Sequence, residues 1–326
     1  MTISEPIASG AITVGIDISK DSLDVALHPG GQTRRFANTR AGHTALLRWI
    51  GKQNLIRVVF EATGPYHRDL EQRLEQAGVP FAKVNPRQTR RFAEAIGTLA
   101  KTDQVDALML ARFGALLEPA TRPALPENLR HLAAFVAARR ALIGDRTATL
   151  NRSKTLSHQL LKRHAQHRLR QIEAQLVSLD AAIDALIAAD PALARRREIL
   201  LSIPGLGAVT AHALLADFPE LGTMDERQAA SLAGLAPVTR QSGTWQGRSF
   251  IQGGRKHLRQ ALYMPALVAM RFNADLATRY TALVARGKHP KLAITAIMRR
   301  LVVIANALLR DDRTWQSEPP GAGARG

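Results

Sequence analysis

The stretch AITVGIDIS, residues 11–19, alternates β-branched residues with others and carries a single acid, Asp17. This alternation predicts a β-strand. A carboxylate inside such a strand is costly to bury unless a cation or hydrogen-bond donors meet it. Asp17 is therefore the first candidate for a functional residue, and the strand that carries it is the first element of a predicted sheet.

The sequence that follows this strand alternates between strand-like and helix-like patterns. Strands are predicted over residues 24–28, 33–39, 56–62 and 79–85, and helices over 65–76, 86–96 and 103–116, with a further helical pattern near Ile50. The resulting order, β-β-β-α-β-α-β-α, is that of the ribonuclease-H-like fold, a mixed sheet with flanking helices. We therefore predict an α/β domain over residues 11–125, preceded by a flexible segment over residues 1–10.

Three more acids are predicted to lie near Asp17. Glu61 ends an apolar strand, while Asp103 and Asp106 are three residues apart and so share one face of a helix. In a ribonuclease-H-like sheet the first and fourth strands are neighbours and a late helix packs beside them, so the four carboxylates can converge. Four oxygen ligands without His or Cys suit Mg²⁺ or Mn²⁺ and do not suit zinc. Two such ions about 4 Å apart assist phosphodiester cleavage.

Other interpretations of these acids stay open at this point. Considered one at a time, Asp103 and Asp106 can be ordinary charges on a helix surface, and Glu61 can be an ordinary residue at the end of a strand. The GIDIS stretch also resembles the first phosphate loop of actin-like ATPases and sugar kinases. Those proteins need further glycine-rich phosphate loops, which the sequence lacks in a comparable place. The metal site is therefore the favoured interpretation.

From about Pro126 the pattern becomes purely helical. Apolar residues between Leu169 and Leu186 recur at intervals of three and four, which is the repeat of a coiled-coil seam. We predict a helical coiled-coil region over residues 126–195, a hairpin that turns near residues 163–168 and packs against itself or against another subunit. Residues 196–316 are predicted to form a mainly helical domain, and residues 317–326 a disordered tail.

The segment SIPGLG, residues 202–207, lies between two helical patterns and resembles a helix-hairpin-helix motif. In such a motif the backbone N–H groups around Gly205 and Gly207 can approach a phosphate. A tight glycine-rich turn between packed helices explains the same residues. Gly205 and Gly207 are therefore candidates for nucleic-acid contact, with the turn as the alternative.

The charge of the chain points to a polyanionic partner. Its 326 residues include 45 Lys and Arg against 27 Asp and Glu, a formal net charge of +18, and no cysteine. Between Arg240 and Arg300 twelve basic residues face one acid, Asp275, and such one-sided charge favours binding to nucleic acid. The absence of cysteine excludes disulfides, thiolate metal sites and a cysteine nucleophile. No apolar run reaches about 18 residues and no signal peptide is evident, so we expect a soluble protein without a membrane partner.

Ser242 lies in the sequence RQSG, within the most basic part of the chain. Its hydroxyl can attack a phosphodiester if a base removes the proton and cations stabilise the phosphorane. The neighbouring cations that can hold phosphates are Arg240, Arg248, Arg255, Lys256 and Arg259. From spacing alone, a Ser-Gly pair in a loop is the plainer interpretation of Ser242.

A set of short motifs runs through these regions: GIDISK, FEATG, NP followed by KTDQVDA, SIPGLG, AGLAP, QSG, GG and LRQALYMPA. With them the sequence resembles, from about Ile12 to Leu309, the IS110 group of insertion-sequence transposases, which join a RuvC-like DEDD domain to a C-terminal serine domain. The resemblance implies that Ser242 is the catalytic serine and that the DEDD acids, which bind Mg²⁺, are Asp17, Glu61, Asp103 and Asp106.

The resemblance also implies a reaction and its partners. Such enzymes cut and rejoin donor and target DNA through a phosphoserine intermediate, guided by a noncoding bridge RNA. By resemblance the protein is a homotetramer in which the serine of one subunit completes the DEDD site of another, in the bacterial cytoplasm at the nucleoid. Two alternatives stay open: a RuvC-like junction resolvase or nuclease that cuts by hydrolysis, and an inactive nucleic-acid-binding protein.

Overall fold

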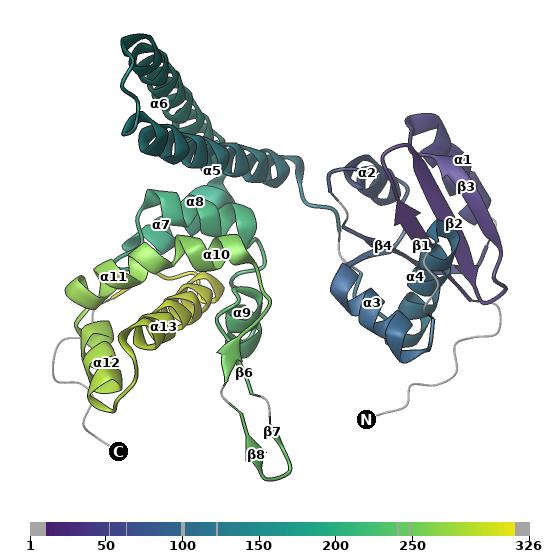
Figure 1. Ribbon diagram of the computed structural model, residues 1–326. Helices are drawn as coiled ribbons and strands as arrows, with labels where there is room; N and C mark the ends of the chain where they lie inside the picture. The colour runs from purple at the N-terminus through teal and green to yellow at the C-terminus, as the bar shows by residue number, and fades with distance from the viewer. Residues whose placement is uncertain are drawn as a thin grey trace. The chain divides into compact units, whose positions relative to one another are not determined.

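The computed structural model describes residues 11–51, 53–62, 64–98, 102–121, 123–239, 241–247 and 249–316. The chain divides into two compact units between Leu125 and Pro126. Figure 1 shows a mixed α/β unit at the N-terminal side of this division and a mostly helical unit at the other. The predictions of a flexible N-terminus and a disordered tail fall on residues 1–10 and 317–326, which lie outside the described residues.

The N-terminal unit is built on a five-stranded mixed sheet of order β3-β2-β1-β4-β5. β2 pairs antiparallel with β1 and β3, whereas β4 pairs parallel with β1 and β5. The predicted mixed sheet, with its first and fourth strands as neighbours, is therefore confirmed. The strands are β1 (Ile12–Ile18), β2 (Ser22–His28), β3 (Thr33–Ala37), β4 (Leu55–Glu61) and β5 (Phe81–Val84).

Helices cover both faces of this sheet. α1 (Arg40–Ile50) and α2 (Arg68–Gln76) share a buried apolar cluster with the β1 residues Val14 and Ile16. α4 (Asp103–Leu117) packs on the opposite face, where its Leu110 and Phe113 share a second cluster with Val59 of β4, and α3 (Pro86–Ala95) contacts α4. Successive side chains of a strand point to opposite faces, so the alternation within β1 separates these two layers.

Two glycines allow α4 to lie directly on the sheet. A Cβ atom on Gly15 of β1 would lie 2.1 Å from the carbonyl oxygen of Ala107 and 2.3 Å from the amide nitrogen of Ala111. A Cβ on Gly114 of α4 would lie 2.6 Å from a methyl carbon of Thr13. Such distances are far below van der Waals contact, so glycine is required at both positions. The close approach fixes the start of α4 beside the end of β1.

The C-terminal unit begins with a long helical hairpin of α5 (Glu127–Ser153) and α6 (Gln159–Ala188), which pack along each other. Ile172, Leu176 and Ile183 of the predicted seam are buried. The predicted turn near residues 163–168 is wrong, because α6 runs through these residues and the chain turns over residues 154–158. The Arg and Gln residues of that stretch favour helix and lie on its exposed surface.

The remaining helices surround α13 (Pro290–Arg310), of which twelve residues are buried. Within the described residues α13 alone is long and apolar enough to cross a membrane, yet 67% of its most apolar window is buried inside the protein. Its burial in one cluster with α5 to α12 explains this composition as that of a core helix. The other helices of the unit are α7 (Pro191–Ser202), α8 (Ala208–Asp217), α9 (Glu226–Leu232), α10 (Lys256–Ala261), α11 (Tyr263–Phe272) and α12 (Ala274–Ala285).

Candidate active site

A row of charged residues crosses the face of the sheet that α4 covers. Asp17 at the end of β1 lies directly opposite Asp24 of β2, and Asp24 lies opposite Arg35 of β3. Residues directly opposite on paired strands point to the same face. Asp17 also shares its face with Gly15, two residues earlier, so its carboxylate lies on the side where α4 begins.

The carboxylate of Asp17 meets several other negative charges. Its pKa is raised from 3.8 to about 6, first by burial and then by repulsion from Asp106, Asp103, Glu61 and Asp24. Asp106, Asp103 and Glu61 therefore lie close enough for their charges to act on Asp17. The strand order, the close packing of α4 and the spacing within α4 bring together residues that are up to 89 positions apart, from Asp17 to Asp106.

A cleft of about 330 Å³ opens beside three of these acids, Asp17, Glu61 and Asp106. Thr89 and Glu94 of α3 line the same cleft. The buried hydroxyl of Thr89 donates a hydrogen bond to a carboxylate oxygen of Glu61, which fixes the orientation of that carboxylate. Sequence reasoning did not find Thr89 or Glu94; the available signal was that both belong to the helix that directly follows β5, Thr89 in its first turn and Glu94 in its last.

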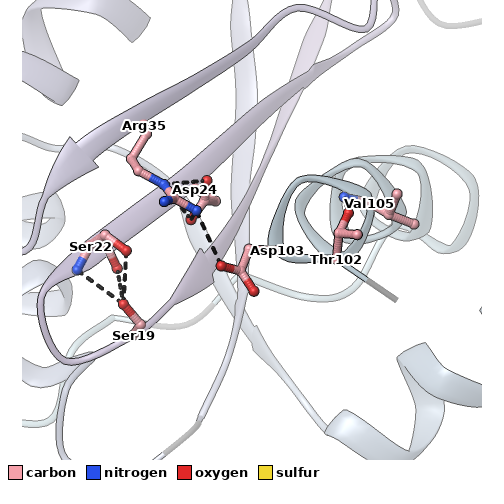
Figure 2. Close-up of polar contacts among 7 residues, drawn as sticks. All are labelled: Ser19, Ser22, Asp24, Arg35, Thr102, Asp103 and Val105. Atoms are coloured by element: carbon pink, nitrogen blue, oxygen red, sulfur yellow. Dashed lines mark hydrogen bonds and ion pairs between the residues drawn. The ribbon is translucent and has the colours of Figure 1, made fainter. Parts of the chain in front are cut away.

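Asp103 has a different environment from the other three acids. Its side chain is 63% exposed at the start of α4, where its Oδ2 lies 3.1 Å from an Nη of Arg35. Arg35 in turn donates a forked pair of hydrogen bonds to Asp24, at 2.9 Å from Nε to Oδ1 and 2.9 Å from Nη2 to Oδ2 (Figure 2). Asp24 was also missed from the sequence, although the tight β1–β2 connection places it opposite Asp17.

The carboxylates of this site are suitable ligands for a divalent metal ion. In this structure, however, they do not lie close enough together to surround one. Mg²⁺ and Mn²⁺ prefer carboxylate oxygens, and a cation would relieve the repulsion that raises the pKa of Asp17. Among the residues that the structure describes, no three Asp, Glu or His side chains are close enough together to hold a metal ion. The pairing of Asp103 with Arg35 draws one of the four carboxylates toward a competing cation.

Ser242 lies in the other unit, on a short β-ribbon. β6 (Pro237–Val238) pairs with β9 (Phe250–Ile251), and β7 (Gln241–Ser242) pairs with β8 (Trp245–Gln246) so that Ser242 is opposite Trp245. Figure 1 shows the β7–β8 hairpin extending away from the helices of its unit. Ser242 is exposed, and within the described ranges no residue forms a hydrogen bond with its hydroxyl. If Ser242 is the nucleophile, as predicted, the described residues of this hairpin offer it no acid or histidine as a base.

The cations that were predicted to surround Ser242 differ in what they contact. Arg255 forms two hydrogen bonds of 2.7 Å with Glu220, and its guanidinium lies over the ring of Phe218. Arg259 donates hydrogen bonds to the carbonyl oxygens of Gly234 and Gly253, which lie on either side of the ribbon in the sequence, and so it holds the base of the ribbon. Lys256 is exposed at the start of α10. Arg240 and Arg248 lie outside the described residues.

The two glycines of SIPGLG also differ. Gly205 has a φ of +99°, and a Cβ there would lie 2.8 Å from the backbone of α11, at the carbonyl oxygen of Pro265. Packing against α11 therefore requires glycine at this position. Gly207 is exposed and caps the start of α8, with open space around its α-carbon. Nucleic-acid contact by either glycine stays a prediction.

The sequence matches two known family models and several known proteins. A family model described as a transposase, with the DEDD domain of IS110 elements, matches residues 14–166, and a second, described as the transposase IS116/IS110/IS902 family, matches residues 197–281. A pilin gene-inverting protein of Moraxella bovis is 32% identical over 316 residues, which cover 93% of this chain and 97% of that protein. An uncharacterized 43.6 kDa protein of the insertion element IS110 from Streptomyces coelicolor is 36% identical over 157 residues, 47% of this chain and 37% of that protein.

These similarities extend over both units. They include the segments that carry the cleft beside Asp17, Glu61 and Asp106, here called the acidic cleft, and the ribbon of β6 to β9 that carries Ser242, here called the serine ribbon. The protein is therefore a transposase, an enzyme that recombines DNA. The chain belongs to the IS110 family of transposases.

Proposed function

We propose that this transposase cuts and rejoins DNA strands through a phosphoserine link formed by Ser242. In this proposal Asp17, Glu61, Asp103 and Asp106 hold Mg²⁺, or Mn²⁺ in its place. The raised pKa of Asp17, caused by burial and by the other three acids, is the observation that supports the acidic site most strongly. When bound, the metal ion would supply positive charge for the scissile phosphate and for the charge that develops on it.

In the proposed reaction Ser242 exchanges one phosphodiester bond for another in two steps. The Ser242 oxygen forms a bond to the phosphorus, the bond from phosphorus to one sugar oxygen breaks, and that oxygen leaves as a strand hydroxyl after taking up a proton. The serine proton passes to a base. A hydroxyl of the partner strand then attacks the phosphoserine and restores Ser242, so each phosphodiester is conserved and no external energy source is needed.

The position of Ser242 favours a shared active site. Its hydroxyl is exposed on a hairpin of the helical unit, whereas the acids belong to the α/β unit. A homotetramer in which the serine of one subunit completes the acidic site of another accounts for a nucleophile without a local base. Exposed apolar residues near the turn of the α5–α6 hairpin support assembly through this hairpin, and they are Ile143, Leu150, Leu160 and Leu161.

Further parts of the proposal concern the fold, the location and the partners. The strand order β3-β2-β1-β4-β5 supports a RuvC-like, ribonuclease-H-like domain. The net charge of +18 supports binding of donor and target DNA together with a noncoding bridge RNA, in the bacterial cytoplasm at the nucleoid. With base pairing as the source of sequence specificity, the protein needs mainly backbone contacts.

One observation favours a second candidate function, a metal-dependent junction resolvase or nuclease. Among the described residues nothing hydrogen-bonds the Ser242 hydroxyl, and a hydrolytic enzyme would use water as the nucleophile instead. Such an enzyme would leave hydrolysed DNA ends and no covalent link between protein and DNA.

A denaturing gel distinguishes the two functions. The purified protein is incubated with the RNA that flanks its element and with labelled donor and target DNA, in Mg²⁺ or in EDTA. We expect a Mg²⁺-dependent band of protein-linked DNA that is absent in Ser242→Ala and in Asp17→Ala. Recombination at the normal rate by Ser242→Ala would contradict the serine mechanism, and cleaved DNA without the linked band would support the nuclease.

A further inference from the structure

Four arginines of the C-terminal unit surround a cavity that the proposed chemistry does not use. Its volume is about 420 Å³. Arg227 comes from α9, Arg279 from α12, and Arg299 and Arg300 from α13. Glu226 is the acid on its lining. The other residues that line the cavity are small or apolar, and they are Ala230, Ala236, Pro237, Ala296 and Val303.

Within the chain that the structure describes, no ion pair or hydrogen bond engages the guanidinium groups of these arginines. This distinguishes them from Arg255, which is paired with Glu220, and from Arg259, which donates to the carbonyl oxygen of Gly234. Four positive charges against the one acid of the lining, Glu226, leave the cavity with an excess of positive charge that an entering anion would offset. The arrangement therefore has the charge of a binding site for an anionic group.

The chemistry of the lining selects the kind of anion. A guanidinium presents a planar fork of donors that matches phosphate oxygens, and arginine is favoured where phosphate is held in a fixed orientation. The alanines and Val303 provide an apolar surface beside the charges, which suits a sugar or a base attached to the phosphate. A cavity of this size is in the range of small-ligand sites, so one nucleotide unit of a strand fits its volume.

The cavity lies at the root of the serine ribbon. Pro237, the first residue of β6, lines it, and Ser242 follows five residues later. Five extended residues reach at most about 18 Å, which corresponds to about five nucleotides at a rise of about 3.4 Å. A DNA strand that passes Ser242 can therefore reach the cavity within about five nucleotides.

We propose that this cavity, lined by Arg227, Arg279, Arg299 and Arg300, binds a backbone phosphate of the DNA strand that Ser242 attacks, within about five nucleotides of the scissile phosphate. The proposal rests on the proposed function, since it takes Ser242 as the nucleophile. The cavity would be a second contact with the same DNA strand, on the same unit as Ser242, and it would fix which phosphate of that strand faces the serine.

The chain has no cysteine, so Ser242→Cys provides a unique thiol for testing this register. The full-length variant is equilibrated in a thiol–disulfide buffer with a mixed-sequence DNA strand that carries a thiol tether on one phosphate. Neutral methylphosphonates then replace the other phosphates one at a time. We expect the disulfide-linked fraction to fall about tenfold at one position within about five nucleotides of the tether, because one charge-assisted phosphate contact is lost, and to change little elsewhere.

The same scan is repeated with Arg279→Ala and Arg300→Ala added. Both side chains are exposed, so the fold does not depend on them, and the sensitive position should disappear. Arg286→Ala, which removes the same charge from the end of α12 outside the cavity, should keep it. A scan without a sensitive position, or one that survives the double substitution, would overturn the proposal. So would a sensitive position that appears only with an RNA strand of the same sequence.

This test does not depend on strand cleavage, so it separates the cavity from the serine chemistry. In one outcome the scan shows a sensitive position that depends on the two arginines, while the denaturing gel shows no protein-linked DNA. This combination would reject the phosphoserine mechanism and keep the cavity as a DNA backbone site. A negative scan combined with normal protein-linked DNA would reject the cavity and keep the mechanism.

Discussion

Asp24 lies directly opposite Asp17 on the neighbouring antiparallel strand. Two like charges in this arrangement destabilise a sheet, and the Asp24 side chain is only 4% exposed. Arg35, opposite Asp24 on the next strand, neutralises it with a forked contact and also reaches Asp103. Arg35 thereby connects a buried carboxylate of the sheet to one of the proposed metal ligands.

Replacing Arg35 with alanine is expected to lower the melting temperature, because Asp24 then keeps a buried charge without a countercharge. Adding Asp24→Asn should recover part of the loss, since the buried charge is removed. The measurement is a double-mutant cycle of melting temperatures at pH 7.5 in EDTA. Arg48→Ala, which removes an exposed cation from α1, is the control. A double variant no more stable than Arg35→Ala would show that Asp24 does not depend on this pairing.

Asp17→Asn is expected to stabilise the metal-free protein at neutral pH. Folding raises the pKa of Asp17 from 3.8 to about 6, so the folded chain binds this proton more tightly, and the resulting stability is lost as pH rises from about 4 through 6. The amide lacks the charge, so its advantage should be small at pH 4 and, because solvent screens this half-buried group, on the order of 1–2 kcal/mol at pH 7.5. Melting temperatures at both pH values in EDTA measure the difference.

Mg²⁺ provides the second part of this test. At pH 7.5 the ion should raise the melting temperature of the unsubstituted protein more than that of Asp17→Asn, because the amide is a weaker ligand. Asp21→Asn, at an exposed acid after β1, should behave like the unsubstituted chain in both experiments. An Asp17→Asn chain that is less stable than the parent at pH 7.5 would contradict the charge repulsion argued for this site.

The sequence predicted those parts of the fold that depend on local periodicity, and it missed parts that depend on pairing across the chain. β1 and α4 were predicted because alternation and the Asp103–Asp106 spacing are local signals. Asp24 was missed because its importance comes from its register opposite Asp17. The arginines of the cavity were missed as a group because they come from three helices, and only folding brings Arg227 beside Arg300.

The hairpin turn was predicted incorrectly for a related reason. A run of basic residues was interpreted as a loop, whereas Lys and Arg are good helix formers and an exposed helix accommodates their charge. Gly205 differs, because two interpretations, a phosphate contact and a tight turn between packed helices, both require glycine there. Its close contact with α11 demands glycine whether or not a phosphate approaches, so sequence alone could not separate packing from binding.

Gly15→Ala is expected to reduce both stability and DNA recombination. The added methyl group would overlap Ala107 and Ala111 of α4, so α4 must move off the sheet at a cost of about 1–3 kcal/mol, and Asp106 moves with it. Gly144→Ala is the matched control, because nothing lies within 4 Å of that position in α5 and alanine should stabilise an exposed helix by about 0.5–1 kcal/mol. Melting temperature and the yield of recombined DNA are measured together. Unchanged values for Gly15→Ala would contradict the close packing.

Gly243→Val is expected to impair strand exchange without destabilising the protein. Gly243 follows Ser242 at the tip of the hairpin with a φ of +55°, and nothing lies within 4 Å of its α-carbon substituent position. A β-branched residue in this left-handed conformation costs about 1–2 kcal/mol, so the hairpin should leave the geometry that presents Ser242, whereas the helical core stays intact. The amount of protein-linked DNA should fall about fivefold or more at an unchanged melting temperature. Gly144→Ala, at an exposed helical glycine with nothing within 4 Å, should leave the amount of protein-linked DNA near that of the parent. A Gly243→Val chain that forms protein-linked DNA as fast as the parent would show that the hairpin geometry does not position the proposed nucleophile.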